Sequence, residues 1–203
     1  MTVKLYHSPA SPYARKVRCV IEEKRLTALV EQIATDTQAE PAHLVDANPL
    51  GKIPALITDD GLALFDSPVI CAYLDAHPAG NAALLVPAST PDRWQVVRGE
   101  AFGDGLMDLG LYLIDEKRKP EGEKSPTLTA RRRRQVERAL DAAPRLLDEL
   151  PEAFNLGHIA IACALGYFDL RHDDIGWRNG RDQLAAWYAE IAKRPSLAAT
   201  APV

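Results

Sequence analysis

Two helix starts in this sequence have the residues to bind an anion. Ser11 precedes Pro12 and a run with helical spacing, and Ser67 precedes Pro68 and a second such run. A serine before a proline is typical of a helix N-cap followed by the first helical residue. The free N–H groups and the positive dipole end of a helix stabilise a carboxylate or a thiolate. We therefore expect Ser11 and Ser67 to cap two helices, each beside an anionic group.

Between the two serines, a turn leads into a short apolar strand. Residues 48–51 (Asn-Pro-Leu-Gly) mark the turn, and Ile53-Pro54 leads into apolar residues 55–57. Because proline has no N–H, backbone groups at the start of this strand stay open to a peptide-like ligand if the Ile53-Pro54 bond is cis. Together with the two helix starts, this segment predicts a pocket for a small anionic peptide.

These motifs resemble those of the cytosolic glutathione transferases. The serine setting is most similar to the serine-type classes (tau, zeta and related bacterial proteins). The resemblance covers the whole chain in length and order of elements, and it is stronger in residues 1–77 than in 90–203. Three motifs in order are more specific than any one alone. The stretches that carry it are Ser11-Pro12-Tyr13-Ala14-Arg15-Lys16-Val17-Arg18, Asn48-Pro49-Leu50-Gly51-Lys52-Ile53-Pro54, and Asp66-Ser67.

The resemblance implies roles for five residues. Ser11 would donate a hydrogen bond to the sulfur of glutathione and so stabilise the thiolate, which attacks an electrophilic second substrate. Lys52 would pair with the glycine carboxylate, and Ile53 would pair its backbone with the cysteinyl moiety. Asp66 and Ser67 would take the amine and the carboxylate of the γ-glutamyl end. Taken singly, these residues also fit a helix cap, a solvated loop charge and an acid at a helix start.

Several alternatives stay open at this stage. Tyr6 or Ser8 could share the role of Ser11, since other transferase classes use a tyrosine at the end of the first strand. A zeta-type isomerase would use the same thiolate, although its usual Ser-Ser-Cys start is absent. A glutathione-binding or protein-interaction member with little turnover, of the stringent-starvation type, is a third hypothesis. No cysteine stands near Ser11, which argues against mixed-disulfide chemistry of the omega, beta or glutaredoxin-like kind.

The electrophile would bind between two domains, where clefts commonly form. Tyr13, Leu106, Leu109 and Tyr112 are the candidates to line this pocket. Apolar residues at helical spacing are also what a plain helical core requires.

The elements that position these residues divide into two domains. Residues 1–77 show a βαβ order, a hairpin and a helix, which is the thioredoxin-like arrangement of the family. Residues 78–90 form a linker, and residues 91–203 form an all-helical bundle. The fold class is therefore α/β plus all-α. Helical patterns cover residues from Thr90-Pro91 to about 117, 129–150, 156–170 and 181–193, with Arg194-Pro195-Ser196 starting the tail.

Two helices carry unusual residues. Pro144 predicts a kink or break in the helix over 129–150. Asn155 caps the next helix, but His158 stands where the family usually has an acid that completes a capping box, so we expect this cap to be weak.

Composition excludes several classes of function. The chain has 203 residues and a net charge of −4, which gives no electrostatic basis for binding nucleic acid or an anionic membrane. The arginines at 131–134 point in different directions on a helix and are followed by acids, which indicates a solvated or salt-bridged face. Apart from glutathione as co-substrate we expect no cofactor and no metal.

The remaining expectations concern compartment and assembly. Cys19, Cys71 and Cys163 are odd in number, widely spaced and set in apolar helical patterns, which favours reduced thiols in the cytoplasm. No apolar run approaches a membrane span and no signal peptide is visible. The resemblance and the frequency of two-fold symmetry predict a homodimer.

Overall fold

The N-terminal residues form a mixed sheet of four strands in the order β2-β1-β3-β4. In this computed structural model, which describes residues 2–89 and 92–203, β1 pairs parallel with β2 and antiparallel with β3. Strand β4 pairs antiparallel with β3 and closes the hairpin predicted from the sequence. The strands are β1 (Val3–His7), β2 (Val30–Ala34), β3 (Ala55–Ile57) and β4 (Ala63–Leu64).

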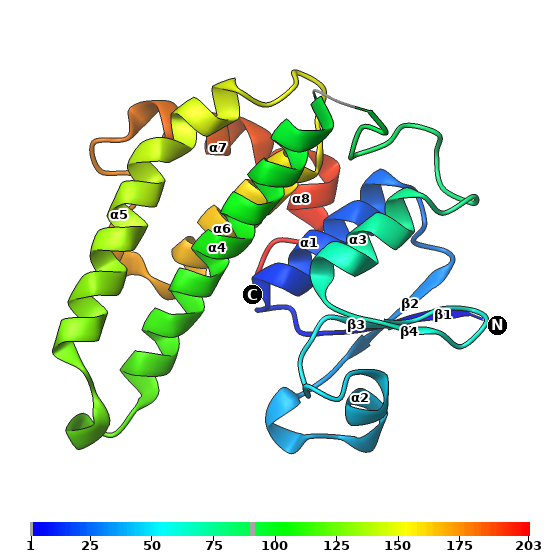
Figure 1. The fold of residues 1–203 in the computed structure, drawn as a ribbon, viewed down its shortest axis with the longest axis horizontal. Coiled ribbons are helices and arrows are strands. Elements are labelled where there is room, and N and C mark those ends of the chain that lie inside the picture. Colours follow the sequence, from blue (N-terminus) through cyan, green and yellow to red (C-terminus); the bar gives the residue numbers. More distant parts are fainter. Residues whose placement is uncertain (1, 90–91) are drawn as a thin grey trace.

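Helices cover both faces of this sheet (Figure 1). Helices α1 (Pro12–Glu23) and α3 (Ser67–Asp75) pack against each other on one face. Helix α2 (Ala42–Ala47) lies on the other face, where Leu44 joins a separate small apolar cluster. The sequence did not predict α2, because six residues are too few to show a helical repeat. The arrangement confirms the thioredoxin-like N-terminal domain.

The C-terminal residues form a helical domain around α6. This helix is buried along nearly its whole length, as its lack of a polar face predicted. It packs closely against α4, where a Cβ added at Gly103 would lie only 2.5 Å from the backbone carbon of Ala160. The helices are α4 (Asp92–Arg118), α5 (Pro126–Asp148), α6 (Leu156–Arg171), α7 (Asp182–Ile191) and α8 (Pro195–Ala199).

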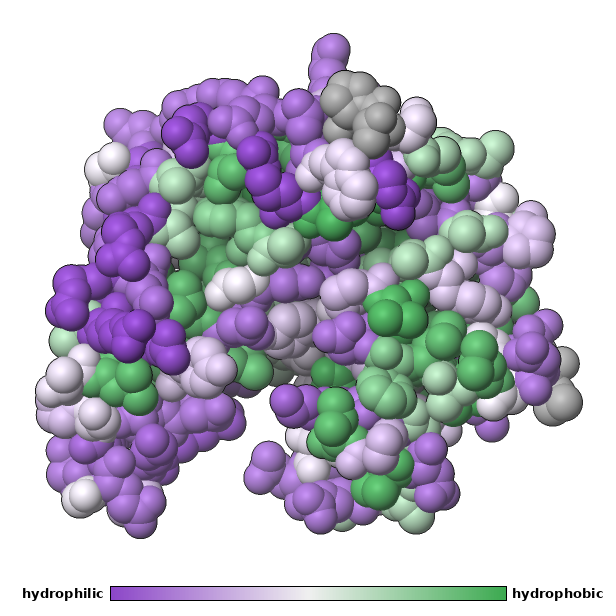
Figure 2. Space-filling model, viewed as in Figure 1, coloured by the Kyte–Doolittle hydropathy of each residue, from purple (hydrophilic) through white to green (hydrophobic). Residues whose placement is uncertain are grey.

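The two domains enclose a hollow. Figure 2 shows the surface hollowed between the lower end of α4 and α5 and the part of the N-terminal domain that carries α2. Helix α1 lies at the domain boundary and packs against α4, α6 and α8. Its N-terminal turn therefore lies beside the helical domain.

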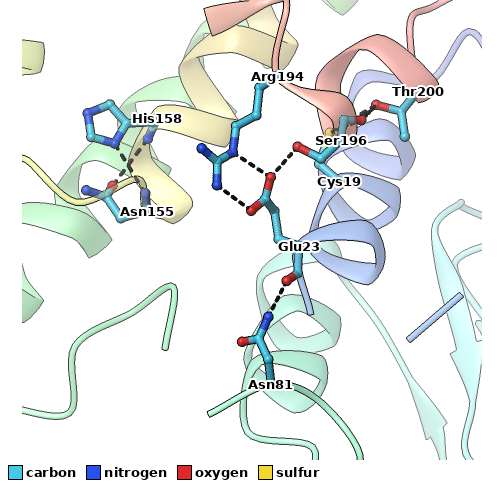
Figure 3. A network of polar contacts seen from close by, with 8 residues as sticks. All are labelled: Cys19, Glu23, Asn81, Asn155, His158, Arg194, Ser196 and Thr200. Atoms are coloured by element: carbon cyan, nitrogen blue, oxygen red, sulfur yellow. Dashed lines mark hydrogen bonds and ion pairs between the residues drawn. The ribbon is translucent and has the colours of Figure 1, made fainter. Parts of the chain in front are cut away.

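Polar contacts tie the last helix to the first (Figure 3). The Arg194 guanidinium donates to both carboxylate oxygens of Glu23, at 2.6 and 2.7 Å. Nearby, Arg15 donates to the backbone oxygen of Leu197 at 3.0 Å. The Sγ of Cys19 lies 3.0 Å from the hydroxyl of Thr200. The tail predicted after residue 194 is thus a short ordered helix, α8, held against α1.

One further expectation about the helices needs correction, and another falls outside the described residues. Pro144 does not break α5, which runs continuously through it. Val136, Leu140 and Ala143 bury the face of α5 that packs on the domain, and this packing outweighs the one backbone hydrogen bond that proline removes. The predicted start of α4 at Thr90-Pro91 lies outside the residues that the structure describes.

The cap of α6 is complete despite the histidine. The side-chain oxygen of Asn155 accepts from the N–H groups of Gly157 and His158, at 3.0 and 3.3 Å. In return, the Asn155 N–H donates to Nδ1 of His158 at 3.3 Å (Figure 3). A neutral imidazole can accept this bond as a carboxylate would. The expectation of a weak cap was therefore wrong.

Candidate active site at the sheet end beside helix α1

Ser11 caps α1 as the sequence predicted. Its backbone is extended, and Pro12 is the first helical residue. The Ser11 hydroxyl oxygen accepts a hydrogen bond from the Ala14 N–H at 3.2 Å. Because the oxygen is the acceptor in this bond, the hydroxyl hydrogen is left to donate elsewhere. The half-buried side chain thus offers one donor at the positive end of a helix.

The second helix start differs by one residue from the prediction. The N-cap of α3 is Asp66, whereas Ser67 is the first helical residue. Aspartate is as favourable an N-cap residue as serine. The Asp66 carboxylate makes no capping hydrogen bond and is exposed, whereas Ser67 is only 2% exposed.

Asn48 folds the loop between these two sites. Its side-chain nitrogen donates to the Lys52 backbone oxygen at 2.8 Å, and its side-chain oxygen accepts from the Leu50 N–H at 3.0 Å. Gly51 has a φ of 62°, a left-handed conformation that favours glycine. Lys52 is exposed and Ile53 is half-buried, and the Ile53-Pro54 bond is cis.

The strand register brings the three motifs to one end of the sheet. Tyr6 in β1 pairs antiparallel with Ala55 in β3, so the chain after Tyr6 runs beside the chain before Ala55. In the same way, Leu64 in β4 pairs with Leu56, so the residues after β4 return to the start of β3. The approach to Ser11, the Ile53-Pro54 segment and Asp66 therefore meet at the same sheet end.

The two alternatives to Ser11 have different environments. Tyr6 belongs to the apolar cluster on the α2 face, and its ring centroid lies 4.9 Å from that of His43. It therefore points to the opposite side of the sheet from α1. Ser8 is half-buried, and its backbone oxygen accepts from the Ser11 N–H at 3.1 Å. Of the two, Ser8 lies closer to the cap of α1.

The four residues predicted to line the electrophile pocket do not share one surface. Leu106 is 1% exposed and belongs to the core, which does not fit a pocket-lining role, and Leu109 is half-buried against the same core. Tyr112 is 55% exposed, with the guanidinium carbon of Arg132 at 4.8 Å from its ring centroid. Tyr13, two residues after Ser11, donates a hydrogen bond from its hydroxyl to Asp108.

Asp108 is the residue at this site that sequence reasoning missed. It lies on α4 and is exposed apart from the contact with Tyr13. Burial and the hydrogen bond to Asp108 raise the pKa of Tyr13 above its usual value, so the phenol stays protonated. No local pattern in the sequence points to Asp108, because its contact with Tyr13 joins residues 95 positions apart.

A buried ion-pair cluster fixes α1 against α4. The ammonium of Lys16 lies 2.9 Å from the Glu100 carboxylate and 2.7 Å from that of Asp104, with the lysine side chain fully buried. Burial raises the pKa of Asp104 to about 6, although Lys16 acts in the opposite direction. Removing one member of such a cluster leaves a buried charge without its partner, which is costly.

A separate pocket of about 540 Å³ lies at the other end of α1. Glu23, Asn81, Phe154, Arg194 and Ser196 are among the residues that line it. Ser11 is the N-cap of α1 and Glu23 is its last residue. A helix of 12 residues separates them by about 18 Å. This pocket is therefore distinct from the Ser11 site.

Three further observations on the described residues concern metal ligands, membrane spans and thiols. Residues 2–89 and 92–203 contain no group of three or more His, Cys, Asp or Glu side chains placed to hold a metal ion. Within the same residues, no helix has the length and apolar character to cross a membrane. Cys19, Cys71 and Cys163 are buried free thiols, as the sequence predicted.

Comparison with known proteins identifies the family. The family model for the glutathione S-transferase N-terminal domain matches residues 5–82, and that for the C-terminal domain matches residues 126–190. The Escherichia coli K12 protein named "Uncharacterized GST-like protein YibF" is 33% identical over 204 residues, which cover 98% of each chain.

Solved structures give the same result. A glutathione transferase family member from Pseudomonas fluorescens Pf-5, with bound glutathione, is 38% identical and superposes with a TM-score of 0.94 over 100% of both chains. A second structure of such a protein holds S-(propanoic acid)-glutathione, with 37% identity and a TM-score of 0.88 over 100% of this chain and 98% of that one. On sequence and structure together, the chain belongs to the glutathione transferase family.

Proposed function

We propose that this protein is a glutathione transferase in which Ser11 stabilises the thiolate of glutathione. The observation that carries the proposal is the hydroxyl of Ser11, which accepts from the Ala14 N–H and keeps its own hydrogen for an anion at the N-terminus of α1. Lowering a thiol pKa by about two units corresponds to roughly 2.7 kcal/mol, which a charge-assisted hydrogen bond and a helix dipole can supply together.

The remaining residues would hold the two charged ends of the tripeptide. Lys52 is exposed beside the folded Asn48 loop and would pair with the glycine carboxylate. Ile53 would offer its backbone to the cysteinyl moiety. At the start of α3, the Asp66 carboxylate makes no capping hydrogen bond and would bind the γ-glutamyl amine. Ser67 and the free N–H groups of the helix would bind the γ-glutamyl carboxylate.

The reaction begins with loss of the thiol proton to solvent. The thiolate attacks an electrophilic carbon of the second substrate, and a C–S bond forms. In a substitution a leaving group departs with the bonding electrons. In an addition to a double bond, the π electrons move to the neighbouring carbon, which then takes a proton. Related structures that contain glutathione and a glutathione thioether support this chemistry.

The proposal includes three further expectations. The protein would need no cofactor besides glutathione as co-substrate, and it would act as a homodimer, as is usual for this family. A cytoplasmic location is consistent with the three free thiols, since reducing compartments keep cysteines unpaired.

Retention on immobilised glutathione, followed by a screen of electrophiles, tests the proposal. The screen should include aryl halides for conjugation, cis double bonds for isomerisation and organic peroxides for reduction. We expect retention, elution by free glutathione, and formation of a thioether with at least one electrophile. Isomerisation without conjugation would favour a zeta-type isomerase, and retention without any turnover would favour a binding protein of the same fold.

A further inference from the structure

The cleft face of α4 carries more negative than positive charge. Glu100, Asp104 and Asp108 follow one another at intervals of one helical turn. The buried ammonium of Lys16 pairs with the first two carboxylates and does not contact the third. Because the pKa of Asp104 is raised only to about 6, this group is mostly ionised at pH 7. Three carboxylates thus share one cation, and Asp108 is the one that does not pair with it.

Asp108 is the member of this row that a ligand can reach. Its carboxylate is exposed and forms no ion pair with any residue in the described ranges, 2–89 and 92–203. Arg132, the cation that contacts this part of α4, stacks on Tyr112 and donates to Gln135 of its own helix at 2.9 Å. The Arg132 guanidinium is thus held by Tyr112 and Gln135, with its Nε buried and without a hydrogen-bond partner, and it forms no ion pair with Asp108.

Tyr13 holds this carboxylate against the first turn of α1, the helix that Ser11 caps. Its hydroxyl donates to Asp108, and its Cα lies on the first turn of α1, two residues from Ser11. Because the phenol hydrogen is held by Asp108, the phenol oxygen presents lone pairs rather than a donor. A second substrate that lies over Tyr13 would thus meet a carboxylate and a second oxygen acceptor.

We propose that Asp108, held by Tyr13, determines specificity for the second substrate by favouring electrophiles with a cationic group near the reacting carbon and disfavouring anionic ones. This inference rests on the proposed glutathione site at Ser11. A primary ammonium has three donors and matches both oxygen acceptors, whereas a carboxylate has none and is repelled.

Binding of three matched glutathione thioethers tests the inference without requiring turnover. The ligands are S-(3-aminopropyl)-, S-(3-hydroxypropyl)- and S-(2-carboxyethyl)glutathione, with glutathione itself as the reference, measured by titration calorimetry on the full chain. We expect the ammonium thioether to bind most tightly and the carboxylate thioether most weakly. The hydroxyl thioether should bind with intermediate affinity. An unpaired charge a few ångströms away should make each step in this series, from ammonium to hydroxyl and from hydroxyl to carboxylate, a roughly five- to tenfold change in Kd.

Three variants separate charge from structure. Asp108→Asn should reduce the charge preference several-fold while leaving glutathione affinity within about twofold, and Asp108→Glu should keep the preference. Asp92→Asn removes a charge from the same helix about 24 Å away, well beyond the screening length in physiological salt, and should change nothing.

Each outcome decides the question. If glutathione binds but the three thioethers bind equally, or if Asp108→Asn weakens all ligands alike, the inference is wrong and the glutathione site stands. If glutathione itself does not bind, the proposed function fails, and the inference falls with it.

Discussion

At the scale of single residues, the hydroxyl of Ser11 has two tasks that use different atoms. Its oxygen caps α1 through the Ala14 N–H, and its hydrogen is available to the substrate. Ser125 does the first task alone: it precedes Pro126, and its hydroxyl accepts from the Leu128 N–H at 3.3 Å. The two serines therefore form a matched pair for separating helix capping from chemistry.

Ser11→Ala should raise the pKa of the bound glutathione thiol and lower kcat, with glutathione affinity changed only a few-fold. In the proposed complex the hydroxyl would contact only the sulfur of glutathione, and its loss should cost roughly 1.5–3 kcal/mol, or about 10- to 150-fold in rate near neutral pH. An ultraviolet thiolate titration of the complex, beside the pH–rate profile, measures both effects.

Ser125→Ala is the control for this experiment. Both substitutions should cost about 1 kcal/mol of stability through loss of a cap, but only the change at Ser11 should move the thiol pKa. If Ser11→Ala titrates and turns over like wild type, another group holds the thiolate, and Ser8 is next in line.

Lys52→Ala and Ser67→Ala should each weaken glutathione binding by about 1–3 kcal/mol, because each would remove a proposed bond to a carboxylate of glutathione. Titration calorimetry checks this expectation. Lys193→Ala, which removes an exposed lysine paired with Glu190, serves as the control and should leave affinity unchanged. Unchanged affinity in both test variants would contradict the assigned orientation of glutathione.

Local sequence predicted some residues of the site well and others not at all. Ser11 was predictable because a cap depends on neighbours within one helical turn. Asp108 was not, since its contact with Tyr13 joins residues 95 positions apart and depends on how α1 meets α4. Leu106 shows the same limit, because helical spacing alone cannot distinguish a pocket wall from a core.

At the scale of elements, the close packing of α4 on α6 depends on Gly103. A methyl group there would meet the backbone of Ala160 and Ile161 at 2.5–2.8 Å. Gly105, two residues along the same helix, is exposed, and a methyl group added there would have nothing within 4 Å. Substitution by alanine thus tests a steric clash at Gly103 and helix propensity alone at Gly105.

Gly103→Ala should lower stability by about 1–3 kcal/mol through overpacking, whereas Gly105→Ala should raise it by up to about 1 kcal/mol through helix propensity. Chemical denaturation of both variants measures the two changes. If the two substitutions changed the free energy of unfolding equally and in the same direction, α4 and α6 would be able to move apart without loss of stability.

The cap of α6 should make stability depend on pH. Burial, with a contribution from Arg194, lowers the pKa of His158 from 6.5 to about 4, and the neutral ring accepts the Asn155 N–H. As pH falls, the unfolded chain takes up this proton first, so the contribution is present above pH 6.5 and is lost between 6.5 and about 4. With allowance for solvent screening, the loss should be about 1–2 kcal/mol.

His158→Gln provides the comparison, because glutamine can accept the same bond and does not titrate in this range. The difference in unfolding free energy between wild type and this variant should shrink or reverse as pH falls from 7 to 4. Asp104 acts in the opposite sense, since its raised pKa favours the folded state as it protonates. Because both proteins contain Asp104, its effect cancels in the difference. A constant difference across this range would contradict the assigned role of His158.

At the scale of the whole molecule, apolar side chains remain uncovered on the N-terminal domain. Leu50, Leu62 and Val69 are 65%, 57% and 46% exposed. Figure 2 shows apolar residues gathered over this domain. A partner subunit that covers them would lower the free energy of the assembly.

We therefore expect a homodimer of about 44 kDa, twice the 22.2 kDa of one chain. Light scattering at micromolar concentration checks the mass, and Leu62→Glu should shift the population toward monomer. A single chain of about 22 kDa at this concentration would contradict the expectation.

The contacts between α8 and α1 have a consequence for the order in which the protein is made. Arg15 and Glu23 meet partners that lie 182 and 171 positions later in the chain. At translation rates of about 5–20 residues per second, α1 leaves the ribosome roughly 10 to 35 s before these partners exist. During that time the side of α1 that contacts α8 lacks this partner. The thioredoxin-like domain thus receives part of its cover from a segment synthesised after the helices α4 to α7.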